Sequence, residues 1–399
     1  MANLANIDGL AIASIANLDG NAISAGAVID GLTVPGVATS IVVSAQEVEI
    51  TVGAGQTSNT ATLTTTIIPE NAIVIQNCAR STSNVDDPDH IWFTPVITDG
   101  DTITVKRGAA NAEYTVYCTV WEFTAASIQS VQHGEIAFAE VDNLLTDTDT
   151  LATTVDTDNA ICISRGHWST ESGSSQIPAT TCTVGLTDGD TATAIRSRTS
   201  ADTNAAYTIL EFVPGILDSV EQVDITINSS FDQGSPPFTN TATIGSIDES
   251  KTLLFMGGQR GMGSSSGAHY HQANAALTNG TTITATILAQ SGGTTDGSIS
   301  CTAAEFADGI IASVQRDVTA FAASDTTKNV TISAVVSAKS GVNWLGSAYN
   351  NNNMDARIQP EYNFTTLKLT STTNLALQRG LVGPSGTLLE PSWEIWEFV

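Results

Sequence analysis

Apolar and polar residues alternate along short runs throughout most of the chain. In the run Cys118–Phe123, for example, even and odd positions fall on opposite sides of an extended backbone. Thr and Val dominate such runs, and Gly, Asn or Asp bound them, which is typical of β-strands. Helical periodicity is limited to short candidate helices at 216–220 and 310–314. The pattern predicts an all-β protein.

A long repeat divides these runs into four blocks of about 90 residues. Each block ends in Glu-Phe, and the glutamates, which are 89, 94 and 92 residues apart, are Glu122, Glu211, Glu305 and Glu397. Several short strands in a unit of this size predict an antiparallel β-sandwich or small barrel. We therefore expect four tandem antiparallel β-sandwich modules, at residues 40–125, 126–214, 215–308 and 309–399.

Two further markers recur in register with the closing run. A Gly-containing turn lies in the middle of the first three blocks, at 98–102, 187–191 and 278–282. A serine opens each block, at Ser44, Ser130, Ser219 and Ser313. The fourth block is the most divergent, because it lacks the turn and carries an extra loop at 383–386. The junctions are short and aliphatic, so neighbouring modules are expected to pack rigidly.

The first 39 residues carry a shorter repeat of 11 residues, in which an Asp-Gly pair follows an aliphatic residue. Asp-Gly between apolar residues is a strong hairpin signal, because both central positions of a type I′ turn need positive φ. Such an arm encloses little core of its own, so we expect it to anchor the chain to another structure. The repeated positions are Ile7, Asp8, Gly9, Leu18, Asp19, Gly20, Ile29, Asp30 and Gly31.

The chain is acidic because cations are scarce: 14 Lys and Arg face 41 Asp and Glu, for a formal net charge of −27. Nucleic acid and anionic membrane surfaces are therefore not expected as partners. No run of 18 or more apolar residues predicts a membrane span. The first 79 residues contain no Lys or Arg, so a secretory signal is not expected either. These features predict a chain that is made in a cytosol and does not insert into membranes.

Candidate catalytic motifs are weak. Gly263–Gly267 matches the G-x-S-x-G nucleophile elbow, but that motif requires a strand-to-helix turn, and here it lies in a Gly/Ser-rich loop. The four repeated glutamates have no recurring carboxylate or histidine partner, which an acid or base requires. We expect these glutamates to form hydrogen bonds at strand ends, and we expect no enzymatic activity.

Candidate metal ligands are also incomplete. The five cysteines form no Cys-x-x-Cys pair and are expected to be buried, reduced thiols. His269 and His271 lack a third ligand. The segment Asp86–His90 and the acidic residues between 142 and 158 lack the pattern of a Ca²⁺ loop. No metal site or cofactor is expected, and weak Ca²⁺ binding is the most that these segments support.

A few aromatic residues occupy variable positions beside polar loops. They are Trp92, Trp168, Tyr270 and Trp344. Aromatic side chains on sandwich loops can stack on sugar rings or anchor a protein partner. Ordinary packing in the core or at its rim is the favoured interpretation of the same positions. These residues are the candidate ligand-binding positions.

The arm and the closing run together carry a resemblance. Residues 7–16, Ile-Asp-Gly-Leu-Ala-Ile-Ala-Ser-Ile-Ala, resemble the arm of virion structural proteins of tailed phages, especially marine ones. The Val-x-Glu-Phe run is similar to β-sandwich modules of the same class of particles. The resemblance implies a tail fibre, spike or capsid decoration with capsid or tail proteins as partners, and it assigns no catalytic residue.

We therefore expect a non-enzymatic virion surface protein, made in the host cytoplasm and homo-oligomeric on the particle. The alternative is a carbohydrate-binding adhesin that uses its loop aromatics for attachment to a host surface glycan. In either case the negative charge, spread over arm and modules, would keep copies from sticking to one another.

Overall fold

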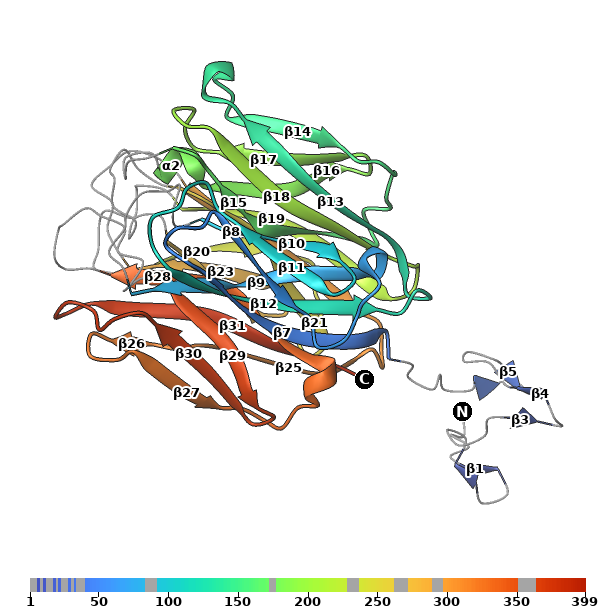
Figure 1. The fold of residues 1–399 in the computed structure, drawn as a ribbon. Coiled ribbons are helices and arrows are strands. Elements are labelled where there is room, and N and C mark those ends of the chain that lie inside the picture. Colours follow the sequence, from blue (N-terminus) through green and yellow to red (C-terminus); the bar gives the residue numbers. More distant parts are fainter. Residues whose placement is uncertain are drawn as a thin grey trace.

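The computed structural model describes residues 40–82, 92–171, 177–227, 237–261, 272–288, 297–350 and 364–399, together with six two-residue strands between residues 6 and 33. Nearly all regular structure is antiparallel β (Figure 1). Among the described residues the exceptions are α2 (Ile177–Thr180) and the 3₁₀ turns η2 (Pro69–Asn71), η3 (Glu140–Asp142) and η7 (Ser337–Lys339). The all-β class predicted from the sequence is confirmed.

One order of strands, long, short, long, short, short, long, occurs four times along the described chain. Block 1 contains β7 (Val42–Val52), β8 (Ser58–Thr62), β9 (Ala72–Ser81), β10 (Thr94–Asp99), β11 (Thr102–Lys106) and β12 (Tyr114–Phe123). Block 2 contains β13 (Ile128–Phe138), β14 (Thr146–Thr150), β15 (Ala160–Trp168), β16 (Cys182–Asp188), β17 (Thr191–Arg196) and β18 (Thr203–Phe212).

The second half of the chain repeats this order. Block 3 contains β19 (Leu217–Ile227), β20 (Phe238–Thr243), β21 (Thr252–Arg260), β22 (Asn274–Asn279), β23 (Thr282–Ile287) and β24 (Gly297–Phe306). Block 4 contains β25 (Ile311–Val318), the additional β26 (Phe321–Ala322), β27 (Thr327–Thr331), β28 (Ser340–Asn350), β29 (Thr365–Ser371), β30 (Asn374–Arg379) and β31 (Leu388–Phe398). The candidate helices at 216–220 and 310–314 were wrong, because alternating residues there begin β19 and β25.

Each block forms two facing sheets. The long strands make one sheet with the closing strand in its centre, as in β7-β12-β9, and the short strands make the other, as in β10-β11-β8. A single residue pair, Thr183↔Gly258, joins β16 to β21, and another, Asn274↔Gly346, joins β22 to β28. Sheets of neighbouring blocks are thereby continuous from block 2 to block 3 and from block 3 to block 4.

The closing strand of a block is buried on both faces. In β12, Val116, Cys118 and Val120 point into the core between the two sheets of block 1. Trp121 and Phe123 point the other way, into a second core to which all four blocks contribute. Alternation in a closing strand therefore separates two apolar environments, which explains why almost every residue of β12 is buried.

Four phenylalanines form a closed ring in this shared core. They are the last residues of the four closing strands, Phe123, Phe212, Phe306 and Phe398. Successive ring centroids lie 5.4, 5.6 and 5.7 Å apart, and the last lies 6.2 Å from the first, with interplanar angles between 78° and 90°. Edge-to-face contacts of this kind are favourable beyond the area they bury. The blocks are thus arranged in chain order around a common centre.

Gly341 leaves room in this core for a large neighbour. Its place in the repeat is taken by Ile73, Ile161 or Leu253 in the other blocks. A Cβ at Gly341 would lie 2.7 Å from Cζ2 of Trp121, whose side chain is fully buried. The indole of block 1 therefore occupies the space that block 4 leaves open.

Replacing Gly341 with alanine is expected to lower the free energy of unfolding by about 1–3 kcal/mol, because the core must move to admit the methyl group. Leu210 of block 2 occupies the position of Trp121 in the repeat, so Trp121→Leu is a suitable background. In this background, Gly341→Ala should lower the free energy of unfolding by a smaller amount. Urea unfolding of the four proteins of this double-mutant cycle measures the coupling. Equal costs in the two backgrounds would contradict the proposed contact.

The ring of blocks closes through contacts between block 4 and block 1. The backbone N–H of Leu369 donates to both carboxylate oxygens of Glu47, at 3.0 and 3.1 Å. The hydroxyl of Thr119 donates to the carbonyl of Val342 at 3.1 Å. Burial raises the pKa of Glu47 to about 7, although the Leu369 N–H and the charge of Lys368 oppose this shift.

The raised pKa makes stability depend on pH. Between the ordinary pKa of 4.5 and about 7, folded protein keeps a proton on Glu47 that the unfolded chain has lost, so this group's contribution to stability decreases as pH rises. We expect wild type to lose roughly 2–3 kcal/mol relative to Glu47→Gln between pH 4.5 and pH 8. Urea unfolding of both proteins across this range measures the difference. A constant difference would contradict the buried position of the carboxyl group.

Three arginines close the ends of their sandwiches by donating to backbone carbonyls. Arg107 binds Gly53 and Gln56, at 2.9 and 2.8 Å from Nη2. Arg196 and Arg379 occupy the same place in the repeat and make equivalent bonds in blocks 2 and 4. Each guanidinium also lies over an aromatic ring, at distances of 4.6–5.9 Å. These three of the nine arginines therefore have structural roles.

The described residues of the arm form three short antiparallel strand pairs. β1 (Asn6–Ile7) pairs with β2 (Leu10–Ala11), β3 (Asn17–Leu18) with β4 (Asn21–Ala22), and β5 (Val28–Ile29) with β6 (Leu32–Thr33), all antiparallel. In each pair the register leaves two residues, Asp and Gly, between the strands. Among the described strands, none of these six pairs with a strand of the blocks.

Candidate functional site

A β-bulge interrupts the third strand of every block at the same place in the repeat. The residue with positive φ is Cys78 in β9, Gly166 in β15, Gly258 in β21 and Gly346 in β28. The three glycines have φ between 89° and 99°, where residues with a side chain are strained. Cys78 adopts φ 65°, which a non-glycine residue adopts at a smaller cost.

The bulges let the blocks approach one another closely. A Cβ at Gly166 would lie 2.3 Å from the carbonyl oxygen of Phe93, and one at Gly258 would lie 2.5 Å from that of Cys182. Gly346 approaches Ala273 in the same way, at 2.3 Å. The bulged strand of each of these blocks therefore lies against the preceding block, at the residue where its fourth strand begins or the residue just before it.

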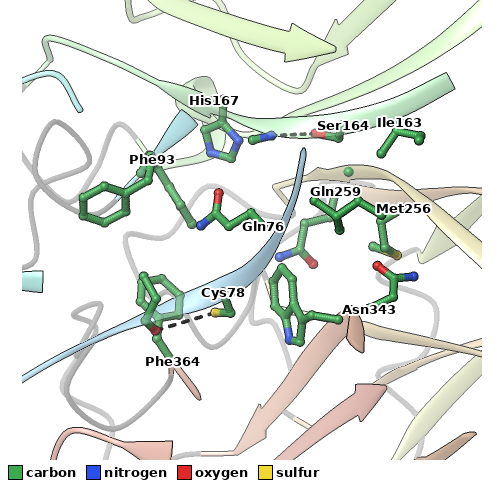
Figure 2. A pocket seen from close by; sticks show the side chains of 16 residues that line it. Gln76, Cys78, Phe93, Ile163, Ser164, His167, Met256, Gln259, Asn343 and Phe364 are labelled. Carbon is green, nitrogen blue, oxygen red and sulfur yellow. Dashed lines mark hydrogen bonds between the residues drawn. The ribbon is translucent and has the colours of Figure 1, made fainter. Parts of the chain in front are cut away.

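A cavity of about 100 Å³ lies where the four bulged strands meet (Figure 2). Most of its wall comes from β9, β15, β21 and β28, and the remainder precedes β10 and β29. Its apolar lining includes Ile75, Ala79, Trp92, Phe93, Ile163, Met256, Trp344 and Phe364. Its polar lining includes Gln76, Ser164, His167, Gln259 and Asn343.

The structure brings two of the predicted ligand-binding aromatics to this cavity. The ring of Trp92 lies 4.5 Å from that of His167, and its Nε1 donates to the hydroxyl of Thr180 at 3.1 Å. Trp344 lines the same cavity and donates to Ser347 at 3.1 Å. Both side chains are partly buried and pack against the block 1 core, so they form an inner wall and not an open platform.

The other two candidates do not join this site. Trp168 follows His167 on β15, lies outside the lining and has no hydrogen-bond partner for its Nε1 among the described residues. Tyr270 lies outside the described residues, as do His269, His271, Asp86–His90 and Gly263–Gly267.

The cavity is electrically neutral. None of the described residues that line it is Asp, Glu, Lys or Arg. Burial lowers the pKa of His167 to about 3, so its imidazole is uncharged at neutral pH. Its Nε2 has no hydrogen-bond partner among the described residues. Burial also raises the pKa of the Cys78 thiol to about 12, which keeps this cysteine protonated and unreactive.

All five cysteines are free and buried, which confirms the expectation of packed thiols. Among the described residues no group of three or more His, Cys, Asp or Glu side chains could hold a metal ion. Three of the acidic residues between 142 and 158 accept hydrogen bonds within the chain: Asp147 from the Thr148 backbone N–H at 2.9 Å, Asp149 from the Tyr207 hydroxyl at 2.7 Å, and Asp156 from the Asn159 amide at 2.8 Å.

The repeated glutamates are structural, as predicted. Glu211 accepts a hydrogen bond from the Ser130 hydroxyl at 2.8 Å and another from the Asp156 backbone N–H at 2.9 Å. The same pair of bonds, to the opening serine and to one backbone N–H, occurs at Glu122, Glu305 and Glu397. Each glutamate therefore ties the closing strand to the start of its own block.

Sequence reasoning missed an ion pair within block 4 whose buried carboxylate also binds block 3. Arg316 Nε lies 2.9 Å from Oε1 of Glu394, and the other carboxylate oxygen accepts from Leu254 N–H and Trp396 Nε1, at 3.0 and 2.9 Å. A signal was present, because Glu394 replaces the threonine that the other three closing runs have at this position. The cavity gave no such signal, since its walls come from four distant segments.

Comparison with models of known protein families and with curated protein sequences found no match. Across the described residues, no helix has the length and apolar character needed to cross a membrane. The geometry of the blocks, the arm and the cavity is therefore the basis for assigning a role.

Proposed function

We propose that this chain is a non-enzymatic structural protein of a virus particle, displayed on the particle surface. Residues 1–39 attach it, and the four blocks project outward as a compact body. The observation that carries the proposal is the division of the chain into a body with a core shared by all blocks and an arm whose described strands pair only within their own hairpins.

The arm is suited to attachment because it repeats a short apolar unit. Each described hairpin presents two residues on either side of an Asp-Gly pair, at intervals of 11 residues. A two-residue strand pair is not stable alone in water. Docking on a partner of the particle, a capsid or tail protein, would supply the missing buried surface, and the resemblance of this repeat to tailed-phage arms favours such a partner.

The body is suited to display. Its blocks close around four phenylalanines, which supports a compact decoration or spike head more than an extended fibre. The net charge of −27 would keep neighbouring copies apart on a crowded surface.

Deletion of residues 1–39 tests the attachment role. The truncated chain is expected to keep the circular dichroism of the body and to be missing from assembled particles. A milder variant, Gly9→Val with Gly20→Val and Gly31→Val, should weaken incorporation, because valine does not favour the positive φ of a type I′ turn. Gly55→Val, at an exposed turn of the body with open space around it, is the matched control. Normal incorporation of the truncated chain would refute the proposal.

The alternative role, a carbohydrate-binding adhesin, has less support. Sugar recognition by stacking needs an exposed aromatic face, whereas Trp92 packs on His167 and Phe364. A glycan array decides this alternative: binding that is lost in Trp92→Ala and Trp168→Ala would favour it over the display role.

A further inference from the structure

The cavity at the meeting point of the four bulged strands is not symmetric, although the strands are repeats. Gln76, Ser164, Met256 and Trp344 occupy the same position of the repeat. These four side chains differ in size and polarity, so the repeat alone does not determine what lines the cavity. Gly166 and Gly258 contribute only backbone atoms to the lining, because carbonyl oxygens of the preceding block lie where their side chains would be.

The lining favours an aromatic occupant. Trp92, Trp344 and Phe364 provide ring faces and edges, and the thioether of Met256 makes favourable contacts with aromatic rings. An engineered apolar cavity of about 150 Å³ is known to bind benzene. The cavity here, of about 100 Å³, limits a rigid occupant to a single ring.

The polar part of the lining favours a neutral molecule with one hydrogen-bonding group. A charged ligand would lose its hydration without finding a counter-charge, because no charged residue is among the described lining. The imidazole of His167 is neutral, and its buried Nε2 has no hydrogen-bond partner among the described residues. Figure 2 shows His167, Gln76 and Gln259 among the side chains around the cavity.

We propose that this cavity is a binding site for a small, neutral, single-ring aromatic molecule that carries one hydrogen-bonding group, placed against His167 Nε2. Such a ligand would contact residues of all four blocks at once. It would therefore bind the closed arrangement of the blocks and stabilise it by mass action. The proposal is independent of attachment to a particle.

Phenol and toluene are the probes, because they have similar size and only phenol forms hydrogen bonds. With the full chain, phenol is expected to bind with a dissociation constant of about 1 mM or tighter, which is ordinary for a ligand of this size. Titration of protein labelled with ¹³C at methionine methyl groups should show a saturable shift of the Met256 signal. Absence of a saturable Met256 shift with both probes up to roughly ten times that concentration would overturn the proposal.

Variants distinguish the contribution of the aromatic ring to binding from that of the hydrogen bond. His167→Phe should weaken phenol binding roughly tenfold and change toluene binding less than about twofold, since one hydrogen bond is lost. His133→Phe, a histidine on β13 outside the cavity, is the matched control and should leave both affinities unchanged. Equal weakening of both probes by His167→Phe would overturn the role of Nε2.

Ser164→Leu should abolish binding of both probes by filling the cavity, and unchanged binding would overturn the location. If these variants do not fold, nuclear Overhauser contacts between phenol protons and the Met256 methyl in wild type decide the question. Their presence supports the site, and their absence at saturation overturns it.

Discussion

Replacing Phe212 with alanine is expected to lower the free energy of unfolding by about 3–5 kcal/mol. The side chain is buried in the core shared by the four blocks, and it contacts Phe123 and Phe306 at ring-centroid distances of 5.4 and 5.6 Å. Removing it leaves a cavity and breaks the closed ring of phenylalanines. Urea unfolding followed by circular dichroism measures the loss.

Leu381→Ala is the control for this variant, because Leu381 is an apolar residue that is 40% exposed. It should change stability by less than about 0.5 kcal/mol. Tryptophan fluorescence, which reports on Trp121 and Trp396 in the same core, should shift together with circular dichroism. A loss below about 1 kcal/mol for Phe212→Ala, or a separate transition for one block, would contradict a core that holds all four blocks.

Gly166→Ala is expected to lower the free energy of unfolding by about 3 kcal/mol or more, and Gly215→Ala by only about 1 kcal/mol. Both glycines have positive φ, 98° and 91°, so an alanine at either position has a strained backbone. They differ in their surroundings. A Cβ at Gly166 would lie 2.3 Å from the carbonyl oxygen of Phe93, whereas a Cβ at Gly215 meets nothing within 4 Å.

The difference between these two variants measures the close approach of block 2 to block 1. Thermal or urea unfolding provides it, and the shared strain cancels in the subtraction. Equal destabilisation by the two alanines would mean that the contact at Phe93 does not hold the blocks together.

Much of the local structure could be predicted from the sequence because it depends on neighbours along the chain. The Asp-Gly pairs of the arm lie between paired strands, and the turn at 98–102 joins β10 to β11. The roles of Glu122 and its three counterparts followed from their recurrence without a catalytic partner. The candidate helices at 216–220 and 310–314 failed because a few aliphatic residues in a strand that meets the shared core can imitate helical spacing.

The arrangement of the blocks could not be predicted in the same way. Phe123 and Phe398 lie 275 positions apart in the sequence and share one ring. The alternation of residues in a closing strand indicates that its two faces meet different surroundings. It does not indicate that both faces are buried. The same limit applies to the cavity, because nothing in the sequence indicated that the loop aromatics Trp92 and Trp344 would line one common wall.

The compact arrangement also changes how the expected surface role is understood. Modules in a row would present four separate loop ends, whereas blocks around a common centre present one body. A ligand or partner that contacts the meeting point of the bulged strands senses all four blocks, so binding there and integrity of the body are thermodynamically linked.

Small-angle X-ray scattering of the full chain tests the closed arrangement most directly. A compact chain of 399 residues has a radius of gyration of about 21 Å, and the arm adds a few ångströms at most to the value expected for the closed body. Four separate domains, each the size of one block, would have a radius of gyration of roughly 35 Å if they were arranged in a row. We predict a radius of gyration below about 25 Å with a single-peaked distance distribution. A value near 35 Å would contradict the closed ring of blocks on which the account rests.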